Sequence, residues 1–240
     1  MQKDHRPYSL KRAHLEMRRL YVRRFLAPQF TRLGKGYTFM QPRHVSVFGA
    51  PIELGDYANV IATPDHKVRL TVWSDRKDRG GIRIGDYCLI CPGVRISSAY
   101  GITIGDNCML AANVYVTDSD WHDVYDRIAT IGKSAPVTIE PNVWIGDSAI
   151  VCKGVTIGEN SVIGAGAIVV DDVPPNTVAA GNPARPVKEL DPGLPIIKRE
   201  DWFRDPAELA RRIDEMDRDM LRGNTLLGWL RSVLFPARGD

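Results

Sequence analysis

The sequence predicts an all-β solenoid, a parallel β-helix of hexapeptide repeats, with helical segments at both ends of the chain. Three observations support this fold class. An aliphatic residue recurs at six-residue spacing, a small or β-branched residue usually follows four positions later, and Gly often follows directly. The aliphatic positions are Ile84, Ile90, Ile96, Ile104, Leu110, Val116, Ile139, Ile145, Val151, Ile157, Ile163 and Val169.

A period of six fits neither the 3.6-residue turn of an α-helix nor the two-residue alternation of one long strand. It fits a short strand of about four residues followed by a two-residue corner, repeated three times in each coil. The aliphatic side chain then fills the interior, and the small side chain points inward where a corner leaves little room. Gly supplies backbone freedom near the turn. The repeat therefore predicts triangular coils joined edge to edge by parallel sheets.

Two segments leave this register. Residues 63–81 contain a strand-like stretch, Val68–Val72, and residues 117–136 form a loop of about twenty residues. Loops of that length in a compact domain are usually functional or disordered. The second loop carries Trp121, His122 and Tyr125. Its aromatic content favours a functional loop over a disordered linker.

The chain divides into three predicted parts. They are a basic N-terminal helical segment (1–36), a β-helix domain (37–190) with loops at 63–81 and 117–136, and a C-terminal helical extension (191–240). Ten Lys and Arg against two acids give residues 1–36 a net charge of +8. An apolar stretch, 225–235, lies near the other end. Both terminal segments either pack on the β-helix or a neighbouring subunit, or lie on an anionic membrane surface.

Composition and charge exclude several classes of protein. Apolar residues make up 44% and charged residues 25% of the 240 positions, as in ordinary globular proteins. A net charge of +3 is too small to predict nucleic-acid binding by the whole chain. No apolar run approaches the roughly 20 residues of a membrane span, and the first residues lack a signal-peptide core. Four cysteines do not make a disulfide scaffold in a chain of this length, so the expected location is the cytoplasm.

Histidine and cysteine are the residues most often used for chemistry. His122 stands out because Asp120 and Asp123 flank it in the aromatic loop. Imidazole titrates near neutral pH and suits a general base, and a neighbouring carboxylate can orient its ring. Cys88 and Cys91 form a C-x-x-C pair, a spacing also found in zinc sites. The repeat, however, assigns the cysteines to inward or glycine-like positions, so we expect core packing and no metal.

The segment 137–185 resembles the hexapeptide-repeat acyltransferases, and the similarity extends over about residues 82–190. It is strongest to the galactoside, maltose and polysaccharide O-acetyltransferase branch. The motifs that carry it are Val143-Trp144-Ile145-Gly146, Gly154-Val155-Thr156-Ile157-Gly158, Asp172-Val173-Pro174-Pro175 and Gly181-Asn182-Pro183-Ala184-Arg185. The resemblance implies a left-handed parallel β-helix, a homotrimer, and acetyl-CoA bound between subunits as the acyl donor. No metal is required.

The resemblance also assigns roles to single residues. It implies that His122 is the catalytic base and that the backbone N–H of Asp147 binds the oxyanion. The remaining residues of the expected oxyanion and acceptor region are Trp144, Asp120 and Asp123. One of the two acids orients the imidazole, or both serve a surface role; the residues alone leave this open.

Contacts to coenzyme A are implied in the same way. The backbone of Ala165 is expected to meet the pantetheine, and Arg185 and Lys188 to lie near the phosphates. A Thr-Lys pair of the family is replaced here by Val170-Asp171. This change removes one phosphate-binding cation and adds an acid.

The resulting hypothesis is an acetyl-CoA-dependent O-acetyltransferase that acts on a sugar hydroxyl in surface polysaccharide biosynthesis. The sugar-binding Asn and Asp of the galactoside enzymes fall on Cys91 and Ala99, so a galactoside acceptor is not expected. An amino-sugar, amino-acid or xenobiotic acceptor and a non-catalytic structural trimer remain alternatives. A γ-type carbonic anhydrase needs three zinc-binding histidines, whereas only His66 and His122 lie in the repeat region. Expected partners are two further copies, a sugar or glycan, and a membrane contact, but no nucleic acid.

Overall fold

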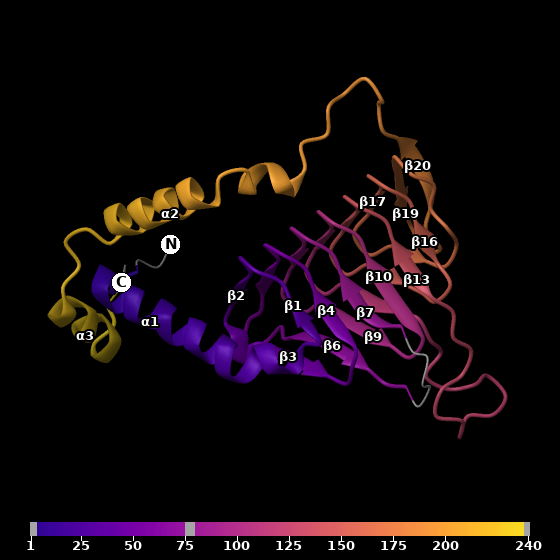
Figure 1. The fold of residues 1–240 in the computed structure, drawn as a ribbon, viewed down its shortest axis with the longest axis horizontal. Helices are drawn as coiled ribbons and strands as arrows, with labels where there is room; N and C mark the ends of the chain where they lie inside the picture. The colour runs from indigo at the N-terminus through magenta and orange to yellow at the C-terminus, as the bar shows by residue number, and fades with distance from the viewer. Residues whose placement is uncertain (1–3, 75–79, 238–240) are drawn as a thin grey trace.

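The computed structural model describes residues 4–74 and 80–237. The chain passes through three sheets in turn, and each strand pairs with the strand one coil further on (Figure 1). The first sheet is β1 (Arg32–Leu33), β4 (Ile52–Leu54), β7 (Gly81–Ile84), β10 (Gly101–Ile104), β13 (Val137–Ile139) and β16 (Thr156–Ile157). The second is β2 (Thr38–Met40), β5 (Asn59–Ile61), β8 (Leu89–Ile90), β11 (Met109–Leu110), β14 (Trp144–Ile145), β17 (Val162–Ile163), β19 (Thr177–Ala180) and β20 (Arg185–Glu189). The third is β3 (Val45–Phe48), β6 (Val68–Val72), β9 (Arg95–Ser98), β12 (Tyr115–Thr117), β15 (Ile150–Val151) and β18 (Ile168–Val169).

The pairings between these strands are parallel except for β19 with β20, which form an antiparallel pair at the end of the stack. The predicted short strands and parallel sheets are therefore confirmed, including β6 at the strand-like stretch 68–72. We call the turns from first to second, second to third and third to first sheet the first, second and third corners. Each corner presents a ladder of equivalent residues from successive coils.

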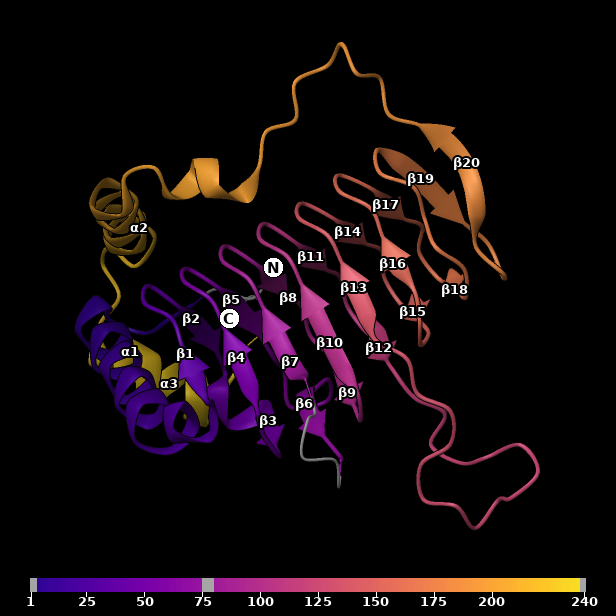
Figure 2. The same cartoon turned by 45° about the vertical axis from the view of Figure 1, so that its right-hand side comes forward.

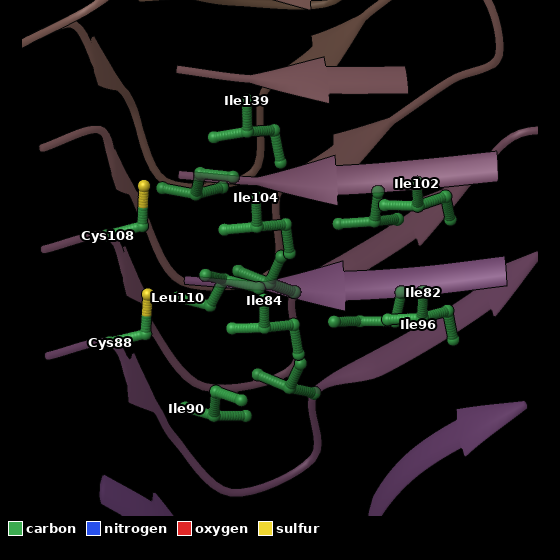
Figure 3. Close-up of a cluster of buried hydrophobic side chains, with 14 of the residues drawn as sticks. Ile82, Ile84, Cys88, Ile90, Ile96, Ile102, Ile104, Cys108, Leu110 and Ile139 are labelled. Atoms are coloured by element: carbon green, nitrogen blue, oxygen red, sulfur yellow. The ribbon is translucent and has the colours of Figure 1, made fainter. Parts of the chain in front are cut away.

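The core consists of the recurring aliphatic side chains. Ile84, Ile104 and Ile139 occupy equivalent positions on adjacent strands of the first sheet and are almost completely buried. Cys88 and Cys108 stack in the same way at the small inward position (Figure 3). Burial of apolar surface stabilises a fold by about 25 cal/mol per Å². Both cysteines are thus core residues, as the repeat predicts.

The first corner uses residues with left-handed backbone. Tyr57, Tyr87 and Asn107 have φ of 53°, 59° and 64°, a conformation that Asn adopts more readily than most residues. In later coils, Asn142 donates to Asn160 at 2.9 Å, and Asn160 to Asn176 at 2.9 Å. This ladder satisfies side-chain amides that the coil stacking brings together.

The helical segments lie beyond the first coil. The helix α1 (Tyr8–Tyr21) continues through Val22–Leu26 and Ala27–Gln29, and Val22 and Leu26 are buried against the coil. This segment covers the open end of the sheets, where unpaired strands and core would otherwise meet water. No helix in the described residues has both the length and the apolarity needed to cross a bilayer.

The C-terminal extension contains Arg199–Phe203, α2 (Pro206–Met220) and α3 (Leu226–Leu234). The α2 helix begins as its sequence predicts, with Asp205 accepting from the backbone N–H of Glu208 at 2.9 Å and Pro206 in the first turn. It then lies alongside α1 (Figure 2). Tyr8 donates to Asp214 at 2.5 Å, and Lys11 pairs with Asp217 at 2.6 Å. Part of the basic charge of α1 is therefore balanced by α2.

Between β20 and α2 the chain returns along the first corner, and we call residues 190–205 the C-terminal arm. Arg199 is half-buried and donates through Nε to the carbonyl of Tyr87 at 2.6 Å and through Nη2 to Asn59 at 2.5 Å. Its burial lowers the pKa of its guanidinium. The ring of Phe203 packs on Tyr57 and Tyr87. The arm thus fastens two successive coils to the terminal helices.

Replacing Arg199 with Ala should release this arm. Two hydrogen bonds from a charged donor are lost, so chymotrypsin should cleave near Trp202 at least about tenfold faster in limited proteolysis. Arg204→Ala is the matched control, because Arg204 is mostly exposed and, among the described residues, forms an ion pair with Asp201 alone. Equal cleavage rates in the two variants would show that Arg199 does not hold the arm.

Candidate functional site

The loop 118–136 leaves the third corner between β12 and β13 and projects away from the sheets (Figure 2). Asp118 anchors its base and is completely buried. Its carboxylate accepts five hydrogen bonds of 2.6–2.9 Å. The donors are the hydroxyls of Ser98 and Ser119 and the backbone N–H groups of Ala99, Tyr100 and Gly101. One side chain therefore joins the loop to the preceding coil.

Sequence reasoning missed Asp118, although a signal was available. Val116 points into the core, and strand alternation makes the residue two positions later point inward as well. An acid at an inward position must be hydrogen-bonded, so Asp118 was recognisable as a buried anchor.

The two limbs of the loop run side by side. The backbone N–H of Asp120 donates to the carbonyl of Lys133 at 2.9 Å, and that of Gly132 to the carbonyl of Asp120 at 2.7 Å. The carboxylate of Asp120 pairs with Lys153, at 2.7 Å, on the third corner of the next coil. Asp120 thus ties the loop to the stack.

His122 is exposed on this loop, and its Nδ1 lies 3.2 Å from the carbonyl oxygen of Ala129. A carbonyl only accepts, so this hydrogen bond requires a proton on Nδ1 and leaves the lone pair of a neutral ring on Nε2. The orienting group is a backbone carbonyl. Neither Asp120 nor Asp123 forms a hydrogen bond or ion pair with the imidazole.

Asp123 shapes the turn that follows His122. Its Oδ1 accepts from the backbone N–H of Tyr125 at 2.8 Å and of Asp126 at 3.1 Å. The hydrogen bonds from Asp126 and Tyr125 lower the pKa of Asp123. Asp123 therefore remains a carboxylate and fixes the loop conformation that brings Ala129 back to His122.

A hollow of about 460 Å³ lies at the base of the loop, between the loop and the third sheet. Its walls are Trp73, Ser74, Ser97, Trp121, Thr130 and Ile131. The indole N–H of Trp121 donates to the hydroxyl of Tyr115 at 3.1 Å, which holds the ring in place. Trp121 precedes His122, and Thr130 follows Ala129. A lining with two tryptophan side chains and three hydroxyl groups suits a sugar ring, which has apolar faces and polar edges.

The residues expected to bind the oxyanion and pantetheine lie at the second corner. Asp147 is exposed, and its carbonyl accepts from the N–H of Gly166 at 2.7 Å, beside the exposed Ala165. Trp144 on β14 is half-exposed. No hydrogen bond within the described residues links His122 to any of these three. Within one chain the predicted site residues therefore form two separate groups, one on the loop 118–136 and one at or beside the second corner.

Arg185 and Lys188 lie on β20, and both are exposed. The guanidinium of Arg185 pairs with Asp171 at 2.7 Å. Asp171, which stands where the family has a cation, therefore pairs with Arg185, one of the two side chains expected to bind the phosphates. Within the described parts of the chain, no group of three or more His, Cys, Asp or Glu is arranged to hold a metal ion.

Two family models match the repeats. The bacterial transferase hexapeptide (six repeats) covers residues 136–171, and the hexapeptide repeat of succinyl-transferase covers residues 81–118. The galactoside O-acetyltransferase of Escherichia coli K12 is 49% identical over 112 residues, 46% of this chain and 45% of that protein. The curated relatives are thus matched over less than half of their length.

Two solved structures extend the comparison. A maltose O-acetyltransferase from Clostridium difficile 630 is 32% identical, with 65% of this chain and 71% of that chain covered and a TM-score of 0.36. A galactoside acetyltransferase in complex with coenzyme A is 28% identical, with 77% and 82% covered and a TM-score of 0.47. From the repeat models and these sequence identities, the chain belongs to the hexapeptide-repeat acyltransferase family.

Proposed function

We propose that this protein is an acetyl-CoA-dependent O-acetyltransferase that acetylates a sugar hydroxyl, in the synthesis of a surface polysaccharide. One observation carries the proposal most strongly: the carbonyl of Ala129 holds His122 in the tautomer whose Nε2 can accept a proton, beside a tryptophan-lined hollow. The galactoside and maltose O-acetyltransferase relatives support the same chemistry.

The proposed reaction begins when Nε2 of His122 accepts the proton of the sugar hydroxyl. The hydroxyl oxygen attacks the thioester carbonyl carbon, and the carbonyl oxygen becomes an oxyanion. The backbone N–H of Asp147 donates to that oxyanion. When the intermediate collapses, the C–S bond breaks and the departing sulfur takes the proton from the imidazolium. The products are the acetylated sugar and coenzyme A.

This reaction requires a second copy of the chain. His122 lies at the third corner of the coil formed by β10, β11 and β12, and Asp147 lies at the second corner of the next coil, with the core between the two corners. We propose that the fold is a left-handed parallel β-helix and that three copies associate, so that the loop of one faces the second corner of its neighbour. Sedimentation as a monomer at micromolar concentration, with full activity, would contradict this arrangement.

Coenzyme A is proposed to lie along the second corner, with the pantetheine against the backbone of Ala165 and the phosphates near Arg185 and Lys188. Asp171 competes for Arg185 in the free protein. We therefore expect Asp171→Ala to lower the KM for acetyl-CoA by about two- to fivefold, and Arg185→Ala to raise it by a similar factor.

Steady-state kinetics on both variants tests this prediction. Asp172→Ala is the control, because the neighbouring Asp172 accepts from the N–H of Thr156 and does not contact Arg185. A KM that rises in Asp171→Ala, or that changes equally in the control, would remove Arg185 from the coenzyme A site.

A peripheral contact with an anionic membrane is proposed for the terminal helices. Leu227, Leu234 and Phe235 of the α3 region are 79%, 65% and 73% exposed, and residues 1–36 carry a net charge of +8. Apolar insertion and polybasic attraction together produce reversible membrane binding. Sedimentation with anionic but not neutral vesicles, weakened by salt, is the expected result. No sedimentation at low salt would contradict it.

The function itself is tested by thiol release from acetyl-CoA with a panel of sugars, nucleotide sugars and lipid-linked saccharides. We expect release that depends on a sugar hydroxyl. Release with amines alone would favour an amino-sugar or amino-acid acceptor. No binding of coenzyme A would favour a structural trimer and overturn the proposal.

A further inference from the structure

A second hollow, of about 540 Å³, lies between α1 and the segment that joins β2 to β3. It is at the helical end of the stack, where Figure 1 shows α1 beside β3. It shares no residue with the hollow beside the loop 118–136. The acetyl-transfer mechanism proposed above uses none of its side chains.

The lining of this hollow is strongly basic. Its basic side chains are Arg6, Arg18, Arg43, His14 and His44, and none of the residues that line it carries a carboxylate. Arg6 is paired with Asp4 through hydrogen bonds of 2.9 and 2.7 Å. The guanidinium of Arg43 lies over the ring of Tyr21, 5.7 Å from its centroid. Of the three guanidinium groups, that of Arg6 is therefore paired with a carboxylate, whereas those of Arg18 and Arg43 form no ion pair with a described residue.

Arg18 is the cation of this hollow whose charge is least compensated. It forms no ion pair with any described residue, and its Nε is buried without a hydrogen-bond partner. Burial, and then the charge of Arg6, lower the pKa of the Arg18 guanidinium. A buried donor of a charged group that remains unsatisfied destabilises the free protein. An anion in the hollow would satisfy this donor and relieve the repulsion.

We propose that this pocket binds the phosphate or diphosphate group of a phosphorylated ligand. Guanidinium groups match phosphate oxygens with paired N–H donors, which favours phosphate over a simple halide. The volume exceeds that of a phosphate alone and falls in the range of organic ligands. Met17, Tyr21, Met40 and Pro42 supply an apolar wall for the rest of the molecule.

Calorimetric titration of the full chain with inorganic phosphate and with pyrophosphate tests the site directly. We expect saturable binding, tighter for pyrophosphate, and at least a tenfold loss of affinity in Arg18→Gln. Arg18→Lys keeps the charge but loses the fork of N–H donors, so its affinity for pyrophosphate should lie between those of the parent and Arg18→Gln. Arg24→Gln is the control, because Arg24 is exposed on the same helical segment and does not line the hollow.

A second readout separates binding from a folding defect. Burial, and then the charges of Arg18, Arg6 and Arg43, lower the pKa of His14. The other ionisable groups at this site are His44, Tyr21 and Asp4, and the carboxylate of Asp4 accepts from Arg6. Bound pyrophosphate should therefore raise the pKa of His14 in an NMR titration and leave His122 unchanged. Because Arg18→Gln removes a partly buried charge whose Nε has no hydrogen-bond partner, the variant should melt no lower than the parent.

Two sources of the phosphate group are distinguished by further titrations. Vesicles that contain phosphatidate, compared with neutral vesicles, represent a lipid headgroup. Sugar phosphates and nucleoside diphosphate sugars represent a soluble ligand. The class that binds more tightly than pyrophosphate, and loses affinity in Arg18→Gln, identifies the source. Failure of every probe to bind, or equal binding by Arg18→Gln, would overturn the proposal without affecting the acetyl-transfer function.

Discussion

His122→Ala should lower kcat for acetyl transfer by at least about 100-fold, the lower end of the effect of removing a general base. The hydroxyl would then have to lose its proton to water while it attacks the thioester. The side chain is exposed and forms one hydrogen bond, to Ala129. We therefore expect the melting temperature, the oligomeric state and the KM for acetyl-CoA to stay as in the parent.

The measurement is steady-state thiol release at saturating acetyl-CoA, and added imidazole should restore part of the lost rate. His66→Ala is the matched control, since His66 is the other histidine of the repeat region and lies in a different excursion. That variant should retain nearly the parent kcat. A His122→Ala enzyme with more than about a tenth of the parent kcat would exclude the imidazole as the base.

The orientation of His122 shows where sequence reasoning ends. The histidine itself is recognisable from its loop and from the family resemblance. Its partner is a backbone carbonyl seven residues away, and a carbonyl has no side chain by which a sequence could mark it. Asp120 and Asp123 flank His122 in the sequence, yet the carboxylate of Asp120 pairs with Lys153 and that of Asp123 accepts from its own turn. Proximity along a loop does not determine the direction of a side chain.

The repeats behave differently because each one carries its own signal. A coil needs an aliphatic residue at each inward position, so the period alone predicts the strands and their pairing. The C-terminal arm has no such period. Arg199 pairs with Tyr87 at a separation of 112 residues, and nothing in either segment marks the other. The charge of α1 is visible in the sequence, but its partial neutralisation by Asp214 and Asp217 is not.

Asp118→Ala should be the most damaging single change to the loop. Its carboxylate is completely buried and accepts five hydrogen bonds, three of them from consecutive backbone N–H groups, those of Ala99, Tyr100 and Gly101. Alanine leaves these donors without an acceptor and opens a void. Since each unsatisfied buried group costs about 1–3 kcal/mol, we expect the free energy of unfolding to fall by roughly 3–5 kcal/mol.

The loss should extend to catalysis, because Asp118 fixes the base of the loop that carries His122. We expect kcat to fall by about 100-fold even below the unfolding transition, since a small displacement of a catalytic group is sufficient for such a loss. Urea unfolding and thiol release measure the two effects on the same preparation.

Asp118→Asn separates charge from shape. The amide fills the same volume but replaces one carboxylate oxygen with a donor. In the parent, each carboxylate oxygen accepts at least two hydrogen bonds, so the variant loses at least two of them. Its stability should lie between those of the parent and Asp118→Ala. Asp123→Ala removes a partly exposed acid whose two hydrogen bonds lie within the same loop, and it should shift the urea midpoint far less. If Asp118→Ala unfolds at the same urea concentration as Asp123→Ala, the five hydrogen bonds do not hold the loop to the coil, and His122 must be positioned from within the loop alone.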